Sequence, residues 1–490
     1  MKLSVIRSYR FIPLLIFGLI YISGCAVNPV TGKKQVSFMS EAQEIAMGAD
    51  ADPQIIAQFG LYDNEEIQKF INTHGQEMAA ISLRPHLKYQ FRILDSPVVN
   101  AFAVPGGYIY FTRGIMAHFN NEAEFAGVLG HEIGHITAKH SVDQYTKSTL
   151  AQVLLVGGLI VSPEFRSVAN EAQTAMQLMF LKYSRNNESQ SDELGVEYSS
   201  KVGYDAHEMA GFFNTLNSLS SSADGERIPN FLSTHPDPLD RYENVEQLAD
   251  EWQNKLQLPS YKVNKQSYLS MIDGIVYGED PRQGYVENNT FYHPELKFTY
   301  PVPTNWDYAN SPSQVQMAPK DGKALMVLML AEGNSLQTAA TNAATQLQLT
   351  VATSKQLRVN GLDALEVRSK QVSEDPSTGQ QNVIDFQSVY IQYGQLIYVF
   401  HGLSLPVDFA AYKPHFDKTM YGFAELKDPA KLNLQPSRIK VVTVKSAGTL
   451  GQALLAYSIP TDKHREHGIV NGMDPTDQVV QGEQIKIISK

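Results

Sequence analysis

In the first half of the chain, apolar residues recur every three or four positions, which is the spacing of amphipathic helices. The pattern begins at Ser40, where Ser40 and Gln43 form a capping-box sequence. The same spacing returns in three further stretches, at residues 67–81, 121–140 and about 165–202. Residues 87–93 alternate apolar and polar positions, and residues 98–112 predict paired strands around a Pro-Gly-Gly turn. We therefore expect a mainly α domain with a small β-sheet over residues 40–256.

After Pro259 the pattern changes. Residues 257–290 show no periodicity, and we expect a linker there. Residues 291–430 alternate strand-like apolar runs with helical patterns, which predicts an α+β domain. Residues 437–490 predict a smaller α+β module. Its expected elements are a strand at 439–444, a helix near 450–456 and a closing strand at 485–488.

The N-terminus has the pattern of a bacterial lipoprotein signal. Three cationic residues precede an apolar run over residues 11–22, which is shorter than the roughly 20 residues that a membrane span needs. The run ends in Ile22-Ser23-Gly24-Cys25, similar to a lipobox with Cys25 as the lipidation site. We expect a signal peptide at 1–24, a tether at 25–39 and, because Ala26 follows the cysteine, a periplasmic protein lipid-anchored at the outer membrane of a Gram-negative bacterium. An uncleaved anchor, or a signal with an incidental cysteine, is the alternative.

Composition narrows the class of protein further. The 490 residues are 43% hydrophobic and 19% charged, which is ordinary for a globular protein and excludes disorder. The formal charge is −11, and no basic block exceeds Lys33-Lys34, so we expect no nucleic-acid partner. Cys25 is the only cysteine, and an intramolecular disulfide is therefore excluded.

The strongest chemical signal is the H-E-x-x-H sequence from His131 to His135. Asn121 can cap a helix on which His131 and His135 lie one turn apart on one face, where two imidazoles can hold one zinc ion. Glu132 is then placed to reach a zinc-bound water, and Gly134 leaves space for close packing beneath the metal. The alternative is two histidines with structural partners on a surface helix.

A catalytic zinc site needs a third ligand from another element. Glu188 and Asp192 stand four residues apart on a predicted helix, on a face that otherwise carries small residues. We expect Glu188 to be the ligand and Asp192 to orient a ligand histidine through its other ring nitrogen. Spacing alone does not separate Glu188 from Glu193, and a solvated acidic face is the alternative.

These motifs resemble the HtpX and CAAX prenyl protease superfamily of zinc metallopeptidases, especially its periplasmic lipoprotein branch. The matching stretches are Asn28-Pro29-Val30-Thr31-Gly32, Asn100 to Gly107, Asn121 to Glu124, the H-E-x-x-H, and Tyr183-Ser184-Arg185 leading to Glu188 and Asp192. The resemblance covers residues 26–256 and implies a zincin-like fold of gluzincin type with Zn²⁺ as cofactor. It also implies that Glu188, the first residue of an E-x-x-A-D-type motif, binds the zinc, although Ser191 replaces the usual alanine.

A predicted strand near this site is a candidate for substrate binding. Its residues are Ala101, Phe102, Ala103 and Val104. Pro105 lacks a backbone donor and favours a sheet edge, and an open edge can hold an extended peptide by main-chain hydrogen bonds. A purely structural hairpin is the alternative.

His235 lies in the run Thr234 to Pro238, where two prolines disfavour a helix. In similar peptidases such a loop covers the metal, where its histidine stabilises the oxyanion or blocks the open position as a fourth ligand. We therefore expect a catalytic role for His235, with a surface-loop histidine as the alternative, and Arg241 to tie the loop to carboxylates. His140 falls off the zinc face and is expected to be structural. The apolar run at 150–161 predicts either a core helix or a membrane-facing lip.

Together these features predict a zinc-dependent endopeptidase in which Glu132 assists the attack of a zinc-bound water. The expected substrates are misfolded or misassembled envelope proteins. The alternative is a zinc-stabilised periplasmic holdase or assembly scaffold for outer-membrane proteins. Residues 437–490 weakly resemble a LysM-like module, which implies peptidoglycan as a further partner, and residues 291–430 weakly resemble PsbP-like domains.

Overall fold

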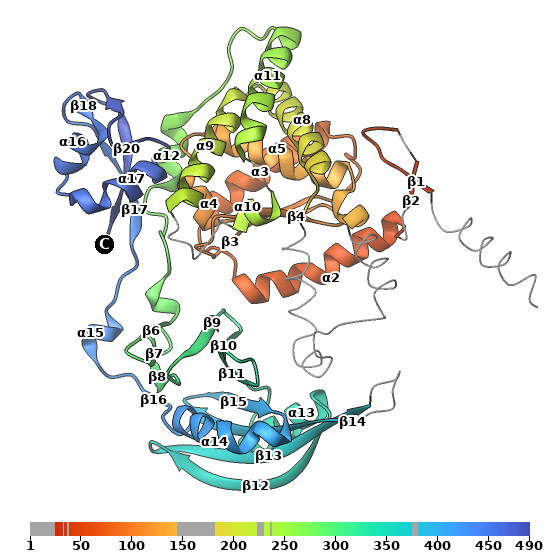
Figure 1. Cartoon of the computed structure of the whole chain (residues 1–490), viewed down its shortest axis with the longest axis vertical. Helices are drawn as coiled ribbons and strands as arrows, with labels where there is room; N and C mark the ends of the chain where they lie inside the picture. The colour runs from red at the N-terminus through yellow and green to blue at the C-terminus, as the bar shows by residue number, and fades with distance from the viewer. Residues whose placement is uncertain are drawn as a thin grey trace, which may run out of the picture.

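The computed structural model describes most of the chain. The described residues are 25–32, 34–36, 39–144, 182–222, 230–235, 238–374 and 381–490. The predicted signal at 1–24, the apolar run at 150–161 and the first part of the pattern at 165–202 lie outside these residues. Figure 1 shows a mainly helical body formed by the first half of the chain, and a second body built around a broad sheet.

Helices dominate the first body, as the sequence predicts. They are α2 (Glu41–Phe59), α3 (Glu65–Ile81), α4 (Arg113–His118), α5 (Glu122–Thr137), α8 (Arg185–Lys201), α9 (His207–Ser222), α10 (Asn230–Thr234) and α11 (Pro238–Leu256). The capping box predicted at Ser40 and Gln43 begins α2, and Asn121 caps α5. A short hairpin of β1 (Cys25–Val27) and β2 (Lys34–Val36) precedes α2.

A three-stranded sheet lies inside this body. Its strands are β3 (Gln90–Leu94), β4 (Ala101–Val104) and β5 (Tyr108–Thr112), in the order β3-β5-β4. β5 pairs with β3 in parallel and with β4 antiparallel. On one face, Ala51 and Ile55 of α2 pack against Phe102 and Tyr110, whereas the other face belongs to a core shared with α3 and α5. The sheet is therefore buried on both faces, with β4 at one edge as Pro105 suggests.

Residues 257–290 are not the linker that the sequence suggests. They contain α12 (Lys265–Ile272), whose Tyr268, Leu269 and Ile272 belong to the core of the first body. The Tyr268 hydroxyl also donates a hydrogen bond to the Met116 carbonyl oxygen, at 2.7 Å. A helix of eight residues is too short for its apolar spacing to be distinctive in a sequence. The one-turn helix η2 (Pro281–Gln283) then leads to the second body.

The second body is built on a seven-stranded sheet in the order β12-β13-β14-β15-β11-β10-β9, in which every neighbouring pair is antiparallel. Its strands are β9 (Trp306–Asn310), β10 (Gln314–Pro319), β11 (Ala324–Leu330), β12 (Leu349–Val359), β13 (Leu362–Glu374), β14 (Gln381–Tyr393) and β15 (Leu396–Ser404). A smaller sheet contains β6 (Tyr285–Glu287), β7 (Thr290–His293), β8 (Phe298–Pro301) and β16 (Ala424–Glu425).

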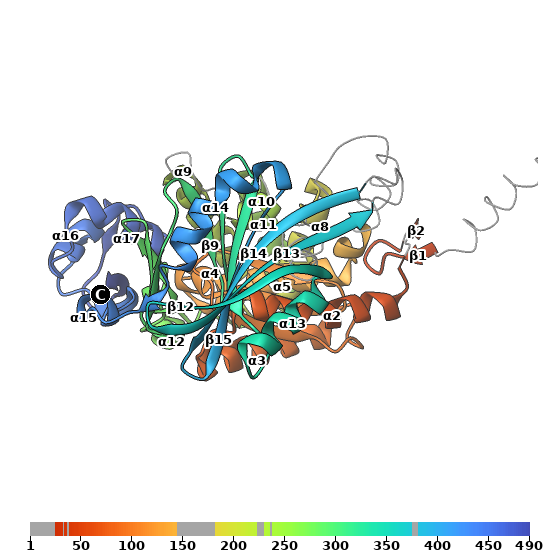
Figure 2. The same cartoon turned by 90° about the horizontal axis from the view of Figure 1, so that it is seen from below.

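Two helices cover opposite faces of the seven-stranded sheet (Figure 2). Ala339 and Ala340 of α13 (Leu336–Gln346) pack against Tyr390. On the other side, Phe416 of α14 (Pro406–Met420) packs against Val389. The apolar spacing at 335–349 and 407–425 predicts two helices, which agree with α13 and α14. The sequence pattern does not predict the long strands β12 and β13.

The C-terminal residues form a small α+β unit, preceded by α15 (Pro429–Leu432). Its elements are β17 (Arg438–Thr443), β18 (Gly448–Thr449), α16 (Leu450–Leu455), η3 (Thr461–Lys463), α17 (His464–Val470), β19 (Gln478–Val479) and β20 (Gln484–Ser489). β17 pairs antiparallel with β20. The unit packs on the first body: the buried Lys486 donates hydrogen bonds from Nζ to the carbonyl oxygens of Ala117 (2.9 Å) and Phe119 (2.8 Å).

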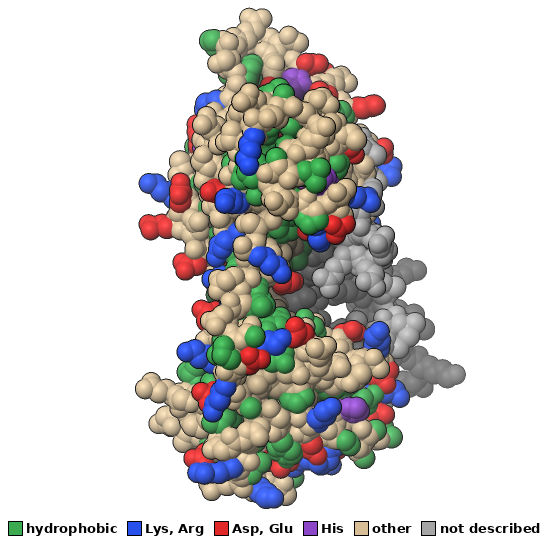
Figure 3. Space-filling model, turned by 90° about the vertical axis from the view of Figure 1, so that its left-hand side faces the viewer, with side chains coloured by type: hydrophobic (Ala, Val, Ile, Leu, Met, Phe, Trp, Pro, Cys, Tyr) green, Lys and Arg blue, Asp and Glu red, His purple; other side chains and the backbone are tan. Residues whose placement is uncertain are grey.

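Among the described residues, no helix is both long enough and apolar enough to cross a membrane. Figure 3 views the molecule from the side that carries the C-terminal unit, and acidic and basic side chains are interspersed there. The described side chains on this face therefore form no dominant basic patch.

Candidate active site

Two helices cross closely enough to bring the residues predicted from the sequence together. A Cβ atom on Gly130 of α5 would lie 2.9 Å from the Gly195 carbonyl oxygen of α8, and a Cβ atom on Gly134 would lie 3.2 Å from the Ser191 Cα atom. Because neither glycine leaves room for a larger side chain, α5 and α8 pack backbone to backbone. This approach brings the imidazoles of α5 next to the carboxylates of α8.

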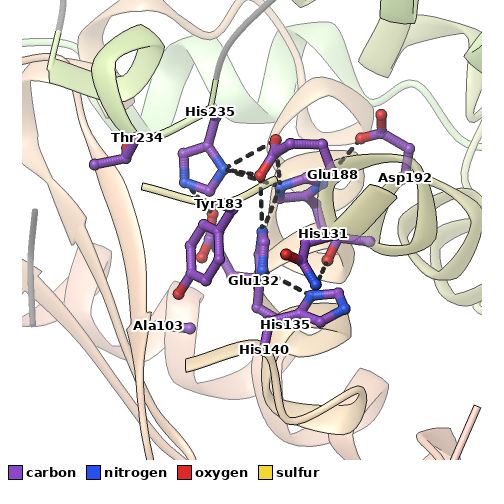
Figure 4. Close-up of polar contacts among 12 residues, drawn as sticks. Ala103, His131, Glu132, His135, His140, Tyr183, Glu188, Asp192, Thr234 and His235 are labelled. Carbon is purple, nitrogen blue, oxygen red and sulfur yellow. Dashed lines mark hydrogen bonds and ion pairs between the residues drawn. The ribbon is translucent and has the colours of Figure 1, made fainter. Parts of the chain in front are cut away.

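His131, His135, Glu188 and His235 form one buried cluster. Each offers a ligand atom, and these atoms lie within 4.8 Å of one another. The Nε2 atoms of His131 and His135 are 3.0 Å apart. The Glu188 carboxylate oxygens lie 3.6 Å from His131 Nε2 and 3.5 Å from His135 Nε2. Figure 4 shows these side chains converging from α5, α8 and the end of α10.

The spacing of the cluster fits one metal ion. Tetrahedral bonds of about 2.0 to 2.2 Å place two ligand atoms about 3.3 Å apart, and the separations of His131, His135 and Glu188 lie near that value. Two imidazoles and one carboxylate are also a donor set of catalytic zinc sites. All four side chains are at most 2% exposed, and a carboxylate buried among three imidazoles is well placed to bind a divalent cation.

Asp192 and Arg241 lie behind His131. The Asp192 carboxylate is 2.9 Å from His131 Nδ1 and accepts two hydrogen bonds from Arg241, at 2.8 Å and 2.6 Å. Arg241 Nη1 also forms an ion pair with Glu188 at 2.8 Å. Burial alone would raise the pKa of Asp192, but Arg241 outweighs it and lowers that pKa to about 2. The ionised Asp192 can therefore accept a hydrogen bond from the Nδ1–H group of His131, which leaves Nε2 free to bind a metal.

Glu132 is fully buried beside the cluster. Neither of its carboxylate oxygens accepts a hydrogen bond from the described residues, and His235 Nε2 is 3.7 Å from one of them. Burial raises the pKa of Glu132, and the nearby imidazoles of His235 and His131 only partly oppose this effect. A carboxylate with a raised pKa is a stronger base than an exposed one, which suits it to accept a proton from water.

His235 completes the cluster on its remaining side. Its Nδ1 atom lies 3.0 and 3.1 Å from the two Glu188 oxygens and 3.3 Å from His131 Nε2. Its ring stacks on Phe231, with centroids 4.4 Å apart. Burial lowers the pKa of His235, but Glu188 outweighs this effect and the net pKa is raised. The next two residues of its loop, 236 and 237, lie outside the described residues.

The sequence of the first, helical body matches a known family. Residues 65–249, which contain every member of the cluster, match the profile of peptidase family M48. Because this segment is similar to that family, we refer to it as the M48 domain. The assignment agrees with the resemblance that the H-E-x-x-H and its flanking motifs suggest.

Individual proteins are similar to part of this chain. Over 176 residues the chain is 30% identical to the mitochondrial metalloendopeptidase OMA1 of Arabidopsis thaliana, which covers 36% of this chain and 34% of that protein. Over 262 residues it is 26% identical to the beta-barrel assembly-enhancing protease of Yersinia pestis, which covers 51% and 52%. The chain therefore spans about half the length of these relatives, or less.

Among solved structures, the chain is similar to cyanobacterial PsbP (CyanoP) of Synechocystis sp. PCC 6803. The two are 13% identical, and the match covers 29% of this chain and 91% of that one with a TM-score of 0.23. A similarity this low carries no argument about the function of the chain.

The structure adds residues to the site that the sequence analysis did not assign to it. Tyr183 stacks on His135, with ring centroids 3.9 Å apart, and its hydroxyl lies 2.9 Å from Ser141 Oγ. His140, expected to be purely structural, lies 3.0 Å from His135 and 2.9 Å from Gln190. No spacing rule connects residues 140 and 190, so only the crossing of α5 and α8 reveals their contact.

The strand that the sequence predicts to bind substrate is β4, and it lies beside the cluster. All four of its residues, Ala101 to Val104, are buried, and Figure 4 shows Ala103 near His140. The Ser141 hydroxyl donates a hydrogen bond to the Ala103 carbonyl oxygen at 3.3 Å. One main-chain acceptor of β4 is thus already used within the M48 domain.

Proposed function

We propose that this protein is a zinc-dependent endopeptidase. The observation that carries the proposal is the juxtaposition of Glu132, a buried carboxylate without a hydrogen-bond donor among the described residues, with a cluster of metal-ligating atoms. His131, His135 and Glu188 would hold the zinc ion. When bound, zinc supplies a Lewis acid that polarises the scissile carbonyl and makes water more acidic.

Within this site the residues of the chain have separate tasks. Glu132 accepts the proton of the attacking water and passes it to the leaving amine. His131 is oriented by Asp192, and Arg241 keeps Asp192 ionised at neutral pH. A scaffold that only needed zinc for stability would have no use for Glu132, which favours the peptidase over the holdase alternative.

In this proposal His235 blocks access of the substrate to the cluster. It is fully buried and contacts Glu188 and His131, so a substrate carbonyl can reach the cluster only when His235 moves. Once displaced, its ring remains within reach of the oxyanion that develops during attack. We expect His235→Ala to retain the metal and to change the rate of cleavage, and an unchanged rate would contradict this role.

The substrates, the location and further partners are inferred from other observations. The name of the Yersinia pestis relative, a beta-barrel assembly-enhancing protease, supports misfolded or misassembled envelope proteins as substrates. The lipobox at Cys25 supports a periplasmic protein held at the outer membrane by a lipid. In the C-terminal unit the paired strands β17 and β20 enclose α16 and α17 along the chain. This arrangement supports a LysM-like module, which purified peptidoglycan can test in a sedimentation assay.

The direct test compares the wild type with Glu132→Gln, which keeps the shape of the side chain and removes the base. We expect both proteins to bind one zinc ion per chain, and the variant to cleave casein about 10²- to 10⁴-fold more slowly. A zinc-loaded Glu132→Gln protein that cleaves at the wild-type rate would overturn the role of Glu132. A folded wild type that binds no transition metal, or that does not cleave casein, would overturn the proposal.

A further inference from the structure

The two histidines of the H-E-x-x-H differ in what lies behind them. His131 has a carboxylate, Asp192, at its Nδ1 atom. His135 has another histidine: its Nδ1 atom lies 3.0 Å from the Nδ1 atom of His140. The far nitrogen of His140, Nε2, lies 2.9 Å from Oε1 of Gln190. A chain of two hydrogen bonds therefore extends from His135 to α8.

We infer that His140, held by Gln190, is a positioning residue that keeps His135 in the tautomer whose Nε2 atom can bind a metal. The inference rests on the proposed metal site and extends it. A metal-binding nitrogen needs a free lone pair, and His135 Nε2 faces the cluster, 3.0 Å from His131 Nε2 and 3.5 Å from a Glu188 oxygen. The ring proton of neutral His135 must therefore reside on Nδ1.

The proton positions then follow along the chain. The Nδ1–H group of His135 donates to His140, whose Nδ1 atom must accept and so carries no proton. Neutral His140 then has its proton on Nε2, where it donates to the amide oxygen of Gln190. The opposite direction would place a proton on His140 Nδ1 and move the proton of His135 to Nε2, inside the cluster. The amide oxygen of Gln190, which faces His140 Nε2, favours the first arrangement because it can only accept. The hydroxyl of Ser191, 3.2 Å from His140 Nδ1, is compatible with it because a hydroxyl can donate to the same unprotonated nitrogen.

The surrounding packing fixes both rings. Tyr183 stacks on the face of His135 at an interplanar angle of 27°, whereas His140 meets the same ring edge-on at 73°. Lys139, which precedes His140, has a left-handed backbone with φ of 59°, a conformation that costs a non-glycine residue roughly 1 kcal/mol. The chain adopts this turn directly after α5, and the next residue contacts the metal-ligating ring.

The tautomer can be measured on the full chain without metal, by ¹⁵N NMR of protein labelled at histidine. In the wild type we expect His135 to be protonated at Nδ1 and unprotonated at Nε2. We expect His140→Ala to lose this fixed tautomer and to bind zinc about 10- to 100-fold more weakly. Gln190→Met, which removes the acceptor at a half-buried position, should weaken zinc binding in the same direction.

Two further variants make the test specific. Gln190→Glu keeps an acceptor facing His140 and should retain both the tautomer and the zinc affinity. Gln247→Met, at an exposed position of α11, makes the same substitution away from the site and should leave both unchanged. Because Gln190 is only partly buried, its substitution should not prevent folding. Comparison of Gln190→Met with Gln190→Glu therefore tests the role of the His140 contact even where His140→Ala fails to fold.

A wild type with the His135 proton on Nε2, or with the averaged signals of a free imidazole, would overturn the inference. Zinc affinity unchanged in both His140→Ala and Gln190→Met would overturn it as well. These outcomes are distinct from failure of the proposed function, because the tautomer is measured without metal and without turnover. A folded, zinc-loaded wild type that does not cleave casein would refute the peptidase while leaving the tautomer of His135 as measured.

Discussion

The two bodies of this chain bury different kinds of polar side chains. The second body, called the sheet body below, spans residues 285–430, and the first is called the helical body. Among the described residues of the sheet body, the buried polar side chains are Ser369, Gln371, Gln387, Ser388, His401, Ser404 and Thr419. All of them are neutral, because burial lowers the pKa of His401 to about 4. The helical body with its docked C-terminal unit buries charged groups instead. These include Glu44, Arg84, Arg113, Glu124, Glu132, Glu188, Asp192, Arg241 and Lys486.

Three buried basic side chains surround one helix, α5, and burial lowers the pKa of one of them, Lys486, to about 7. Lys486 donates to the Phe119 carbonyl oxygen just before the helix begins. Arg241 lies 3.4 Å from His131 Nδ1 near its middle, and Arg84 donates to the Ile136 carbonyl oxygen near its end, at 2.9 Å. Buried charge is costly unless it is paired. The helix that carries the H-E-x-x-H is therefore held by buried charged groups, and removing one of them should be costly. The described residues of the sheet body bury no such groups.

The strongest test of this contrast compares Arg241→Met with Gln387→Met. Arg241→Met leaves Glu188 and Asp192 buried without their cation and should destabilise the metal-free M48 domain by about 3 to 5 kcal/mol. Gln387 donates to Asp417 at 2.7 Å in the sheet body, and its loss should cost about 1 to 2 kcal/mol. Denaturant unfolding of the metal-free proteins measures both.

The two bodies can be monitored separately because the chain has two tryptophans. Trp252 lies in α11 and Trp306 in β9. Trp306→Phe leaves fluorescence from the helical body alone, and Trp252→Phe leaves it from the sheet body alone. The contrast fails if Arg241→Met costs no more than Gln387→Met in these backgrounds.

A smaller effect is expected at the junction with the C-terminal unit. Lys486→Met removes the donor for the carbonyl oxygens of Ala117 and Phe119 and should destabilise the helical body by about 2 to 3 kcal/mol. The matched control is Lys440→Met, at an exposed position of β17, which should change stability by less than about 0.5 kcal/mol. Trp252 fluorescence in the Trp306→Phe background measures both. Equal effects of the two substitutions would show that Lys486 is not a stabilising contact.

The sequence predicts the residues of the cluster partly from local patterns and, for Glu188 and His235, with the help of the family resemblance. The i,i+4 spacing places His131 and His135 on one helix face, and Glu188 and Asp192 share a face with small residues that permit the crossing of α5 and α8. The contacts that hold these residues could not be found in this way. Arg84 and Glu44 are 40 residues apart, and Lys486 lies 367 residues from its partner Phe119.

The elements that the sequence analysis missed share a physical reason. β12 has a single buried residue, Val359, among its eleven, so it lacks the alternation by which half-buried strands are recognised. α12 buries Tyr268, Leu269 and Ile272 against a surface formed by distant segments. In both cases the neighbours, rather than the local sequence, decide the structure.

The smallest predicted effect concerns pH and the sheet body. Burial lowers the pKa of His401 to about 4, below its value of about 6.5 in an unfolded chain. Between these values the unfolded state binds a proton that the folded state does not, so stability is present above pH 6.5 and decreases as the pH falls toward 4. From pH 7 to pH 5 the loss should be about 2 kcal/mol.

His401→Gln should remove this component, because glutamine carries no charge at either pH. His401 Nδ1 and Ser388 Oγ share a hydrogen bond at 2.8 Å. The side-chain amide of the introduced glutamine can replace this bond. His293, whose pKa burial also lowers to about 4, contributes equally to both proteins and cancels in the comparison. If unfolding followed by Trp306 shows the same pH dependence in wild type and variant, His401 is already protonated in the folded state, and the sheet body does bury a charge.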